Sequence, residues 1–159
     1  AFAKDGTVTA ANASSISDGA AALVVTRQSV AEAQGLSMAA RIVSWATHSQ
    51  EPAKFTSAPV PAIRSAMEKA GWTVADVDLF EVNEAFAMVP MIAMKELGIP
   101  AEKLNVNGGG TALGHPIGAS GARIIATLIA ALQNRGLKRG IASLCIGGGE
   151  GTAIAVEIA

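Results

Sequence analysis

The sequence NVNGGGTALGHPIGASG, from Asn105 to Gly121, is the stretch around which we interpret the rest of the chain. Its glycines permit positive φ angles and a close approach of the backbone to a ligand. Pro116 fixes the chain direction directly after His115. The first N–H groups of a following helix would favour an anion or a developing oxyanion. Fixed-spacing glycines are a weak signal by themselves, so this loop leaves both a ligand site and a tight structural turn open.

The composition is typical of a single well-buried domain. The chain has 159 residues, of which 50% are hydrophobic and 16% charged, and its net charge is -1. Because there is no basic excess and no apolar run near the roughly 18 residues of a membrane span, we expect no nucleic acid and no membrane partner. The single cysteine, Cys145, excludes an internal disulfide and favours a reducing compartment. With no targeting signal visible, we expect a cytoplasmic protein, an organellar matrix remaining open.

The apolar pattern predicts an α/β fold with five strands. Residues 1–20 have no sustained period and are expected to form an extended arm. The predicted strands cover residues 21–26, 40–46, 77–82, 141–146 and 152–158. The last two flank GGGEG at 147–151, which favours an antiparallel hairpin.

Four helices are predicted between and after these strands. They cover residues 29–34, 61–70, 84–97 and a central helix whose apolar residues repeat from 124 to 132, and Gly71, Gly98 and Gly136 are expected to end the last three. Pro90 lies inside the third and should kink it or delay its start. The expected order is β-α-β-α-β-α-α-β-β.

Three groups that could take part in a reaction fall at or beyond predicted strand ends, namely Asn83, the loop with His115, and Cys145. Ligands of such sheets bind at the carboxyl ends of parallel strands. A thiolate is a base and a nucleophile, and a nearby imidazole such as that of His115 would lower its pKa. Against these roles, a free cysteine is often a small buried apolar residue, and a strand-end asparagine is often only a turn residue.

Other polar residues have simpler interpretations. His48 lies in a polar segment and is expected to be solvated, and Glu84 is expected to be a charge at a helix N-terminus. Two distant histidines and one cysteine lack the spacing of a metal site. The absence of a G-x-S-x-G motif argues against a serine hydrolase of the α/β type.

Four motifs together resemble the thiolase family. They are GTVTAANASSISDGAA at 6–21, NEAFA at 83–87, NVNGGGTALGHPIGASGAR at 105–123 and CIGGGEG at 145–151. Because they span the chain in order, residues 1–159 resemble the C-terminal half of a thiolase. The resemblance implies a thiolase-like half-domain with a five-stranded mixed sheet between helix layers, ending in the hairpin.

The resemblance also implies catalytic roles. His115 would activate a nucleophilic cysteine and then donate to the thioester oxygen, and Cys145 would take and return protons. Asn83 would hold a water that completes an oxyanion hole with His115. The N–H of Gly147 would serve a second oxyanion hole.

Further positions resemble those that contact coenzyme A. Ser14 would hydrogen-bond the pantetheine arm, and Phe2 and Phe86 would lie near coenzyme A and the acyl pocket. The resemblance implies no permanently bound cofactor and no metal, with coenzyme A thioesters as substrates. The implied partners are acetyl-CoA, 3-ketoacyl-CoA, the N-terminal thiolase half and further copies in a homo-oligomer.

The implied reaction is a reversible Claisen condensation catalysed by an acetyl-CoA acetyltransferase or 3-ketoacyl-CoA thiolase. In the family, the acyl-accepting cysteine belongs to an N-terminal half that these residues do not include, so we expect this chain alone to be inactive. Two alternatives stay open. One is a non-catalytic scaffold or coenzyme A-binding fragment, and the other is a Cys-His hydrolase acylated on Cys145.

Overall fold

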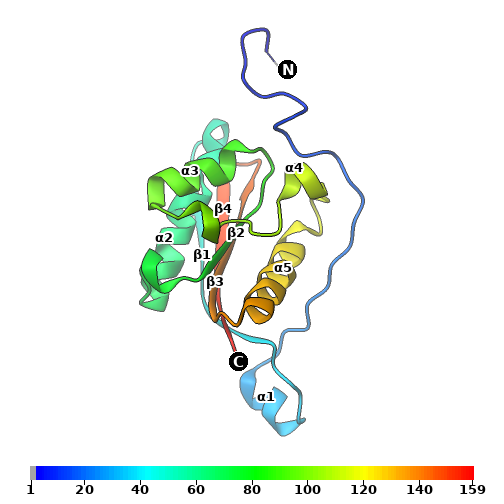
Figure 1. Cartoon of the computed structure of the whole chain (residues 1–159), viewed down its shortest axis with the longest axis vertical. Helices are drawn as coiled ribbons and strands as arrows, with labels where there is room; N and C mark the ends of the chain where they lie inside the picture. Colours follow the sequence, from blue (N-terminus) through cyan, green and yellow to red (C-terminus); the bar gives the residue numbers. More distant parts are fainter. Residues whose placement is uncertain (1–2) are drawn as a thin grey trace.

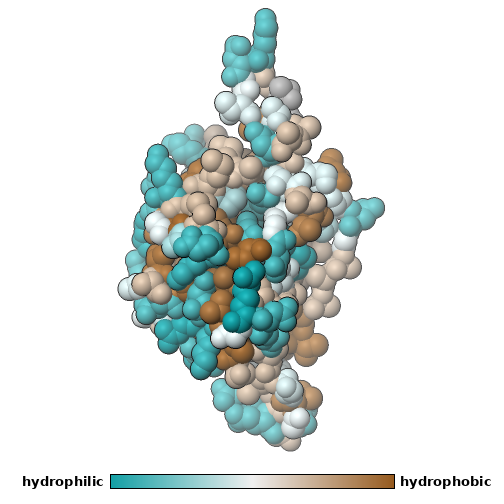
Figure 2. Space-filling view, in the orientation of Figure 1, coloured by the Kyte–Doolittle hydropathy of each residue, from teal (hydrophilic) through white to brown (hydrophobic). Residues whose placement is uncertain are grey.

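The structure is a computed structural model that describes residues 3–159 (Figure 1). Its first part is an arm that continues to Arg27 without a regular helix or strand. The predicted strand at 21–26 is wrong, because these residues pair with no other strand in the described part of the chain. Val24 and Val25 are 96% and 68% exposed, and Figure 2 shows apolar surface where the arm approaches α1. An apolar run becomes a strand only when a partner supplies hydrogen bonds.

The sheet therefore has four strands, and not the five that the sequence predicts. They are β1 (Ala40–Ser49), β2 (Leu79–Val82), β3 (Arg139–Ile146) and β4 (Glu150–Ile158), in the order β1-β4-β3-β2. β2 and β3 are parallel, whereas β4 runs antiparallel to both β1 and β3. The expected mixed sheet and the closing hairpin are confirmed, and β2 and β3 end at the same edge of the sheet.

Helices cover both faces of this sheet (Figure 1). After the short α1 (Gln28–Ala33), α2 (Pro59–Ala70) and α3 (Met88–Leu97) pack on one face, and α5 (Ser120–Arg135) packs on the other. Short elements connect them: η1 (Pro52–Ser57), η2 (Val74–Asp76), η3 (Ala101–Lys103) and α4 (Gly110–Leu113). Among residues 3–159, no helix combines the length and apolarity that a membrane crossing needs.

Local signals explain where these helices begin and end. Gly71, Gly98 and Gly136 follow α2, α3 and α5 in the left-handed conformation, which confirms the predicted helix ends. Pro90 delays the start of α3, which begins at Met88 and not at residue 84. Pro90 is its third residue, where the missing N–H would have no intrahelical acceptor.

Two apolar clusters, one on each face of the sheet, form the core. Phe80 and Ile63 belong to the cluster beneath α2 and α3, whereas Ile124 and Leu128 belong to the cluster beneath α5. All four side chains are at most 1% exposed. Because alternate residues of a strand point to opposite faces, both faces of β2 are buried.

The hairpin strand β4 packs so closely against the start of α2 that one glycine has no room for a side chain. A Cβ at Gly151 would overlap the carbonyl of Ala58, whereas a Cβ at Gly118 would meet no heavy atom within 4 Å. We expect Gly151→Ala to lower the free energy of unfolding by about 1–3 kcal/mol through overpacking. Gly118→Ala, the matched control, should change it by less than about 0.5 kcal/mol.

Urea unfolding of both variants, compared at equal m-value, measures this difference. Equal stabilities of the two variants would contradict the close approach of Gly151 to Ala58.

Candidate active site

Asn83 is held by the backbone at the end of β2. Its N–H donates to the Ser143 carbonyl at 2.8 Å, which continues the parallel pairing with β3 by one residue. The side chain is 1% exposed. The glycine loop begins on the same strand, because the Asn105 amide accepts from the Val82 N–H at 2.8 Å and donates to the Val82 carbonyl at 2.9 Å. Asn83 and the loop are therefore anchored to one strand end.

Glu84 anchors the middle of the glycine loop through hydrogen bonds. Its carboxylate accepts from the Thr111 N–H at 3.0 Å and from the Thr111 hydroxyl. It therefore lies at the N-terminus of α4, a helix that the sequence analysis missed, and not at the start of its own helix. A Cβ at Gly110 would overlap the Glu84 carbonyl. The glycine is required there because the loop approaches the segment after β2 closely.

The imidazole of His115 lies between Asn83 and Ser120. Its Nε2 is 3.3 Å from Asn83 Nδ2, and its Nδ1 is 2.6 Å from Ser120 Oγ. The Ser120 hydroxyl also donates to the Pro116 carbonyl at 3.0 Å. Burial, and secondly the charge of Arg123, lower the pKa of His115 below its ordinary value of 6.5. The imidazole is therefore neutral at pH 7, with a lone pair available to accept a proton.

A charged pair lies directly behind this contact. Arg123 Nη2 donates to Asn83 Oδ1 at 3.4 Å, and Arg123 Nη1 is 3.9 Å from Glu81 Oε2. The Glu81 side chain is 3% exposed and the Arg123 side chain 21%. Burial raises the pKa of Glu81 to about 7, although the Arg123 charge opposes that shift.

Sequence reasoning missed Glu81, Ser120 and Arg123. Two signals were available for finding them. Glu81 is an acidic residue inside the apolar strand VDLFEV, and Ser120 and Arg123 are three positions apart at the start of α5, which places them on one face of the helix.

Cys145 is on β3 opposite Gly151 and is 6% exposed. Its side chain belongs to the apolar cluster beneath α2 and α3, whereas Asn83 and His115 contact residues of α5. Within residues 3–159 no hydrogen bond joins the thiol to Asn83 or His115. Burial raises the pKa of Cys145 to about 11, although its own backbone N–H partly offsets this. The pKa is raised, and not lowered by His115 as the sequence suggested.

The remaining predicted positions surround this edge of the sheet. Gly147 is exposed in the turn between β3 and β4, and in the described part of the chain its N–H has no acceptor. Ser14 ties the arm to the segment after β2, since its hydroxyl donates to the Ala85 carbonyl at 2.9 Å. Its oxygen retains lone pairs that could accept a further hydrogen bond. His48 is partly buried on β1, which differs from the solvated position expected for it.

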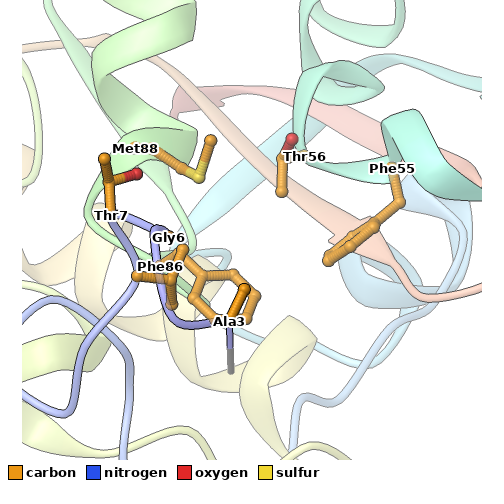
Figure 3. A pocket seen from close by; sticks show the side chains of 8 residues that line it. Ala3, Gly6, Thr7, Phe55, Thr56, Phe86 and Met88 are labelled. Atoms are coloured by element: carbon orange, nitrogen blue, oxygen red, sulfur yellow. The ribbon is translucent and has the colours of Figure 1, made fainter. Parts of the chain in front are cut away.

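A cavity of about 250 Å³ opens beside Phe86. Phe86 and Phe55 meet edge to face with ring centroids 6.2 Å apart (Figure 3). The lining is mostly apolar and combines residues of the arm, of η1, of the segment before α3 and of α3 itself, namely Ala3, Gly6, Thr7, Val8, Phe55, Thr56, Phe86 and Met88. Phe2, the other aromatic position in the prediction, lies outside the described residues. Within residues 3–159, no three His, Cys, Asp or Glu side chains gather as a metal site would require.

Comparison with protein-family models gives two matches. The model "Thiolase, C-terminal domain" matches residues 36–158, and the model "Thiolase, N-terminal domain" matches residues 1–29. The chain is 53% identical over 157 residues to the acetyl-CoA acetyltransferase of Allochromatium vinosum. That alignment covers 99% of this chain but only 40% of the relative.

Solved structures agree with these matches. The Bacillus anthracis acetyl-CoA acetyltransferase aligns with a TM-score of 0.97 at 50% identity, covering 100% of this chain and 40% of that one. A human mitochondrial 3-ketoacyl-CoA thiolase in complex with CoA aligns with a TM-score of 0.92 at 42% identity and the same coverages. The 159 residues therefore span about 40% of the length of the proteins that they match.

The raised pKa of Cys145 predicts slow alkylation of this chain. With a pKa of about 11, only about one thiol in a thousand is ionised at pH 8. We expect the rate with iodoacetamide to rise tenfold per pH unit from pH 7 to 9.5 without levelling, because the thiolate is the nucleophile.

The chain unfolded in urea is the control, since its thiol should level off above roughly pH 8.5. A rate in the folded chain that levels off below pH 9 would contradict burial of the thiol.

The raised pKa of Glu81 predicts a pH-dependent stability. Because its pKa of about 7 exceeds the ordinary value of 4.5, the folded state binds the proton more tightly, so stability falls as pH rises through this window. Glu81→Gln should remove a decrease of about 2–3 kcal/mol in the free energy of unfolding between pH 5 and 8.

Urea unfolding at several pH values measures this slope. Glu102→Gln, at an exposed position of η3, should retain the wild-type slope. An unchanged slope in Glu81→Gln would show that this carboxyl is ionised normally.

Proposed function

The chain belongs to the thiolase family, and on that premise we propose that it is the C-terminal catalytic part of an acyltransferase. The proposed reaction is the reversible Claisen condensation of an acyl-CoA with acetyl-CoA, catalysed by an acetyl-CoA acetyltransferase or 3-ketoacyl-CoA thiolase. The contact between the Asn83 amide and the His115 imidazole, 3.3 Å apart at one edge of the sheet, carries the proposal. The names of the matched relatives support it.

The neutral His115 suits the first step of this reaction. Its imidazole would take the proton from a nucleophilic cysteine of the N-terminal half, which then attacks the thioester carbonyl. Later, the protonated ring and a water held by Asn83 would donate to the oxygen of the enolate. Positioned donors of this kind stabilise charge as it develops, and removing one typically costs about 2.7–4 kcal/mol of barrier.

Cys145 suits the transfer of a proton to and from carbon. The α-proton of a thioester is weakly acidic, so its removal favours a strong base, and a thiolate with a raised pKa is stronger than an ordinary one. Cys145 would first give its proton to the departing coenzyme A thiolate, and the Cys145 thiolate left behind would take the α-proton as the enolate forms. The reverse reaction would return that proton to carbon. The free N–H of Gly147, two residues farther along the chain, would serve a second oxyanion hole.

We further propose acetyl-CoA and 3-ketoacyl-CoA as substrates, with no resident cofactor. Ser14 would accept a hydrogen bond from the pantetheine arm, and the apolar cavity beside Phe86 would receive part of the thioester. Phe2 belongs to this proposal on the family resemblance alone. The human relative with CoA bound supports a coenzyme A substrate.

The proposed partners are an N-terminal thiolase half, which supplies the nucleophilic cysteine, and further copies of the full-length protein. The exposed apolar residues of the arm support an interface with the N-terminal half, since an isolated domain gains nothing from exposing them. A cytoplasmic location suits the single free thiol.

The hydrolase alternative loses support from the structure. A buried thiol with a raised pKa is a poor nucleophile at neutral pH. The scaffold alternative predicts tight coenzyme A binding without turnover. Calorimetry on this chain tests it, because we expect Ser14 and one face of a cavity to bind coenzyme A weakly or not at all.

The activity is tested by pairing this chain with the N-terminal part of a relative, or in the full-length protein, and measuring thiolysis of acetoacetyl-CoA. We expect the chain alone to be inactive. His115→Ala, Asn83→Ala and Cys145→Ser should each lower kcat by about 100- to 1,000-fold. Glu68→Gln, at an exposed position of α2, is the control and should retain activity. Full activity in Cys145→Ser or His115→Ala would overturn the assignment.

A further inference from the structure

We propose that Arg123 is a positioning residue that orients the Asn83 amide and thereby sets which ring nitrogen of His115 carries the proton. The inference deepens the proposed function, on which its kinetic consequence rests. The proposal follows from the directions in which four neighbouring groups can donate and accept hydrogen bonds.

Arg123 fixes the orientation of the Asn83 amide. An arginine side chain has only donors, so the amide atom that it contacts at 3.4 Å must be the oxygen. The Asn83 NH₂ group then faces His115 Nε2 at 3.3 Å. Since that group can only donate, Nε2 must be the unprotonated nitrogen of the neutral ring.

Ser120 contacts the opposite side of the His115 ring. With Nε2 unprotonated, Nδ1 carries the proton and donates to Ser120 Oγ at 2.6 Å. The Ser120 hydroxyl is then free to donate to the Pro116 carbonyl at 3.0 Å. Every hydrogen bond from Arg123 to Pro116 has one donor and one acceptor. The other tautomer would place an Nε2–H against the Asn83 NH₂ group, which is two donors facing each other.

Glu81 holds the Arg123 guanidinium in place. The Glu81 carboxylate lies 3.9 Å from Nη1, whereas Nη2 is the nitrogen that donates to Asn83. In the described structure, Arg123 Nη1 and Glu81 Oε1 have no hydrogen-bond partner. At pH 8, where most Glu81 side chains are ionised, the attraction between the two charges positions the guanidinium. Water does not screen this attraction well, because Glu81 is 2% exposed.

The titratable groups around this network come from several elements. Glu81 lies on β2, Arg123 on α5 and Cys145 on β3, and Glu84 follows β2. The Glu84 carboxylate accepts a hydrogen bond from Thr111, and Cys145 is in the apolar cluster beneath α2 and α3. Arg123 is therefore the charge that acts directly on the Asn83–His115 pair. At rest this network leaves the Nε2 lone pair accepting from the Asn83 amide, and in the proposed reaction that lone pair would take the proton.

Arg123→Lys tests the proposal because lysine keeps the charge but not the planar fork that contacts two groups at once. In the full-length protein, we expect kcat to fall about 10- to 100-fold, because a misplaced catalytic group slows the reaction by about this factor. KM for the thioester should stay within about twofold, since the proposed coenzyme A contacts are at Ser14 and Phe86 and not at Arg123. Arg135→Lys, at the exposed end of the same helix, is the matched control and should behave as wild type.

The direct readout is the ¹⁵N spectrum of histidine-labelled chain at pH 8. The chain has two histidines, so His115 is identified by its loss in His115→Asn. We expect an Nδ1–H tautomer in wild type and a mixture of tautomers in Arg123→Lys. An Nε2–H tautomer in wild type overturns the inference, even if Arg123→Lys does not fold. An unchanged kcat together with an unchanged tautomer in Arg123→Lys also overturns it.

The two proposals can fail separately. An Nδ1–H tautomer in wild type and a mixture in Arg123→Lys, found in a full-length protein without thiolysis activity, would refute the proposed function and support the role of Arg123. Thiolysis activity with the opposite tautomer would do the reverse.

Discussion

The site depends on the parallel pairing of β2 with β3. The N–H of Asn83 continues this pairing by donating to the Ser143 carbonyl at 2.8 Å, so the backbone fixes the point from which the amide side chain extends. Parallel strands end at the same edge of their sheet. The pairing therefore places Asn83 and the hairpin after β3 at one edge, and the amide of Asn105 brings the glycine loop to the same edge.

Burying polar groups at this edge is costly unless each finds a partner. Asn83, Glu81 and Ser120 are each at most 2% exposed, and Arg123 of α5 contacts both Asn83 and Glu81. Such a network favours one arrangement of side chains over others, because any rotated amide or displaced guanidinium leaves a donor or acceptor unsatisfied. The proposed chemistry needs this property, since a base and an oxyanion donor must be in place before the substrate reacts.

Features determined by neighbouring residues were predictable from the sequence, and features determined by distant ones were not. The ends of α2, α3 and α5 follow from single glycines, and the hairpin from GGGEG. The apolar run at 21–26 was misread because a strand needs a partner, which a local pattern cannot supply. Likewise, Asn83 was identified but Arg123 was missed, since they lie 40 positions apart in sequence and meet only when α5 packs on β2.

Burial keeps both His115 and Cys145 neutral at pH 7. Burial disfavours the charged form of each group, which lowers the pKa of the imidazole and raises that of the thiol. The resting pair is consequently a neutral imidazole that can accept a proton and a neutral thiol that can donate one. In the proposed reaction, an ion pair between them would place a cation where His115 must act as a base and would remove the proton that Cys145 must give. Within residues 3–159 no hydrogen bond joins the two groups. His115 contacts Asn83 and Ser120, whereas Cys145 packs in the cluster beneath α2 and α3, so each can keep its own protonation state.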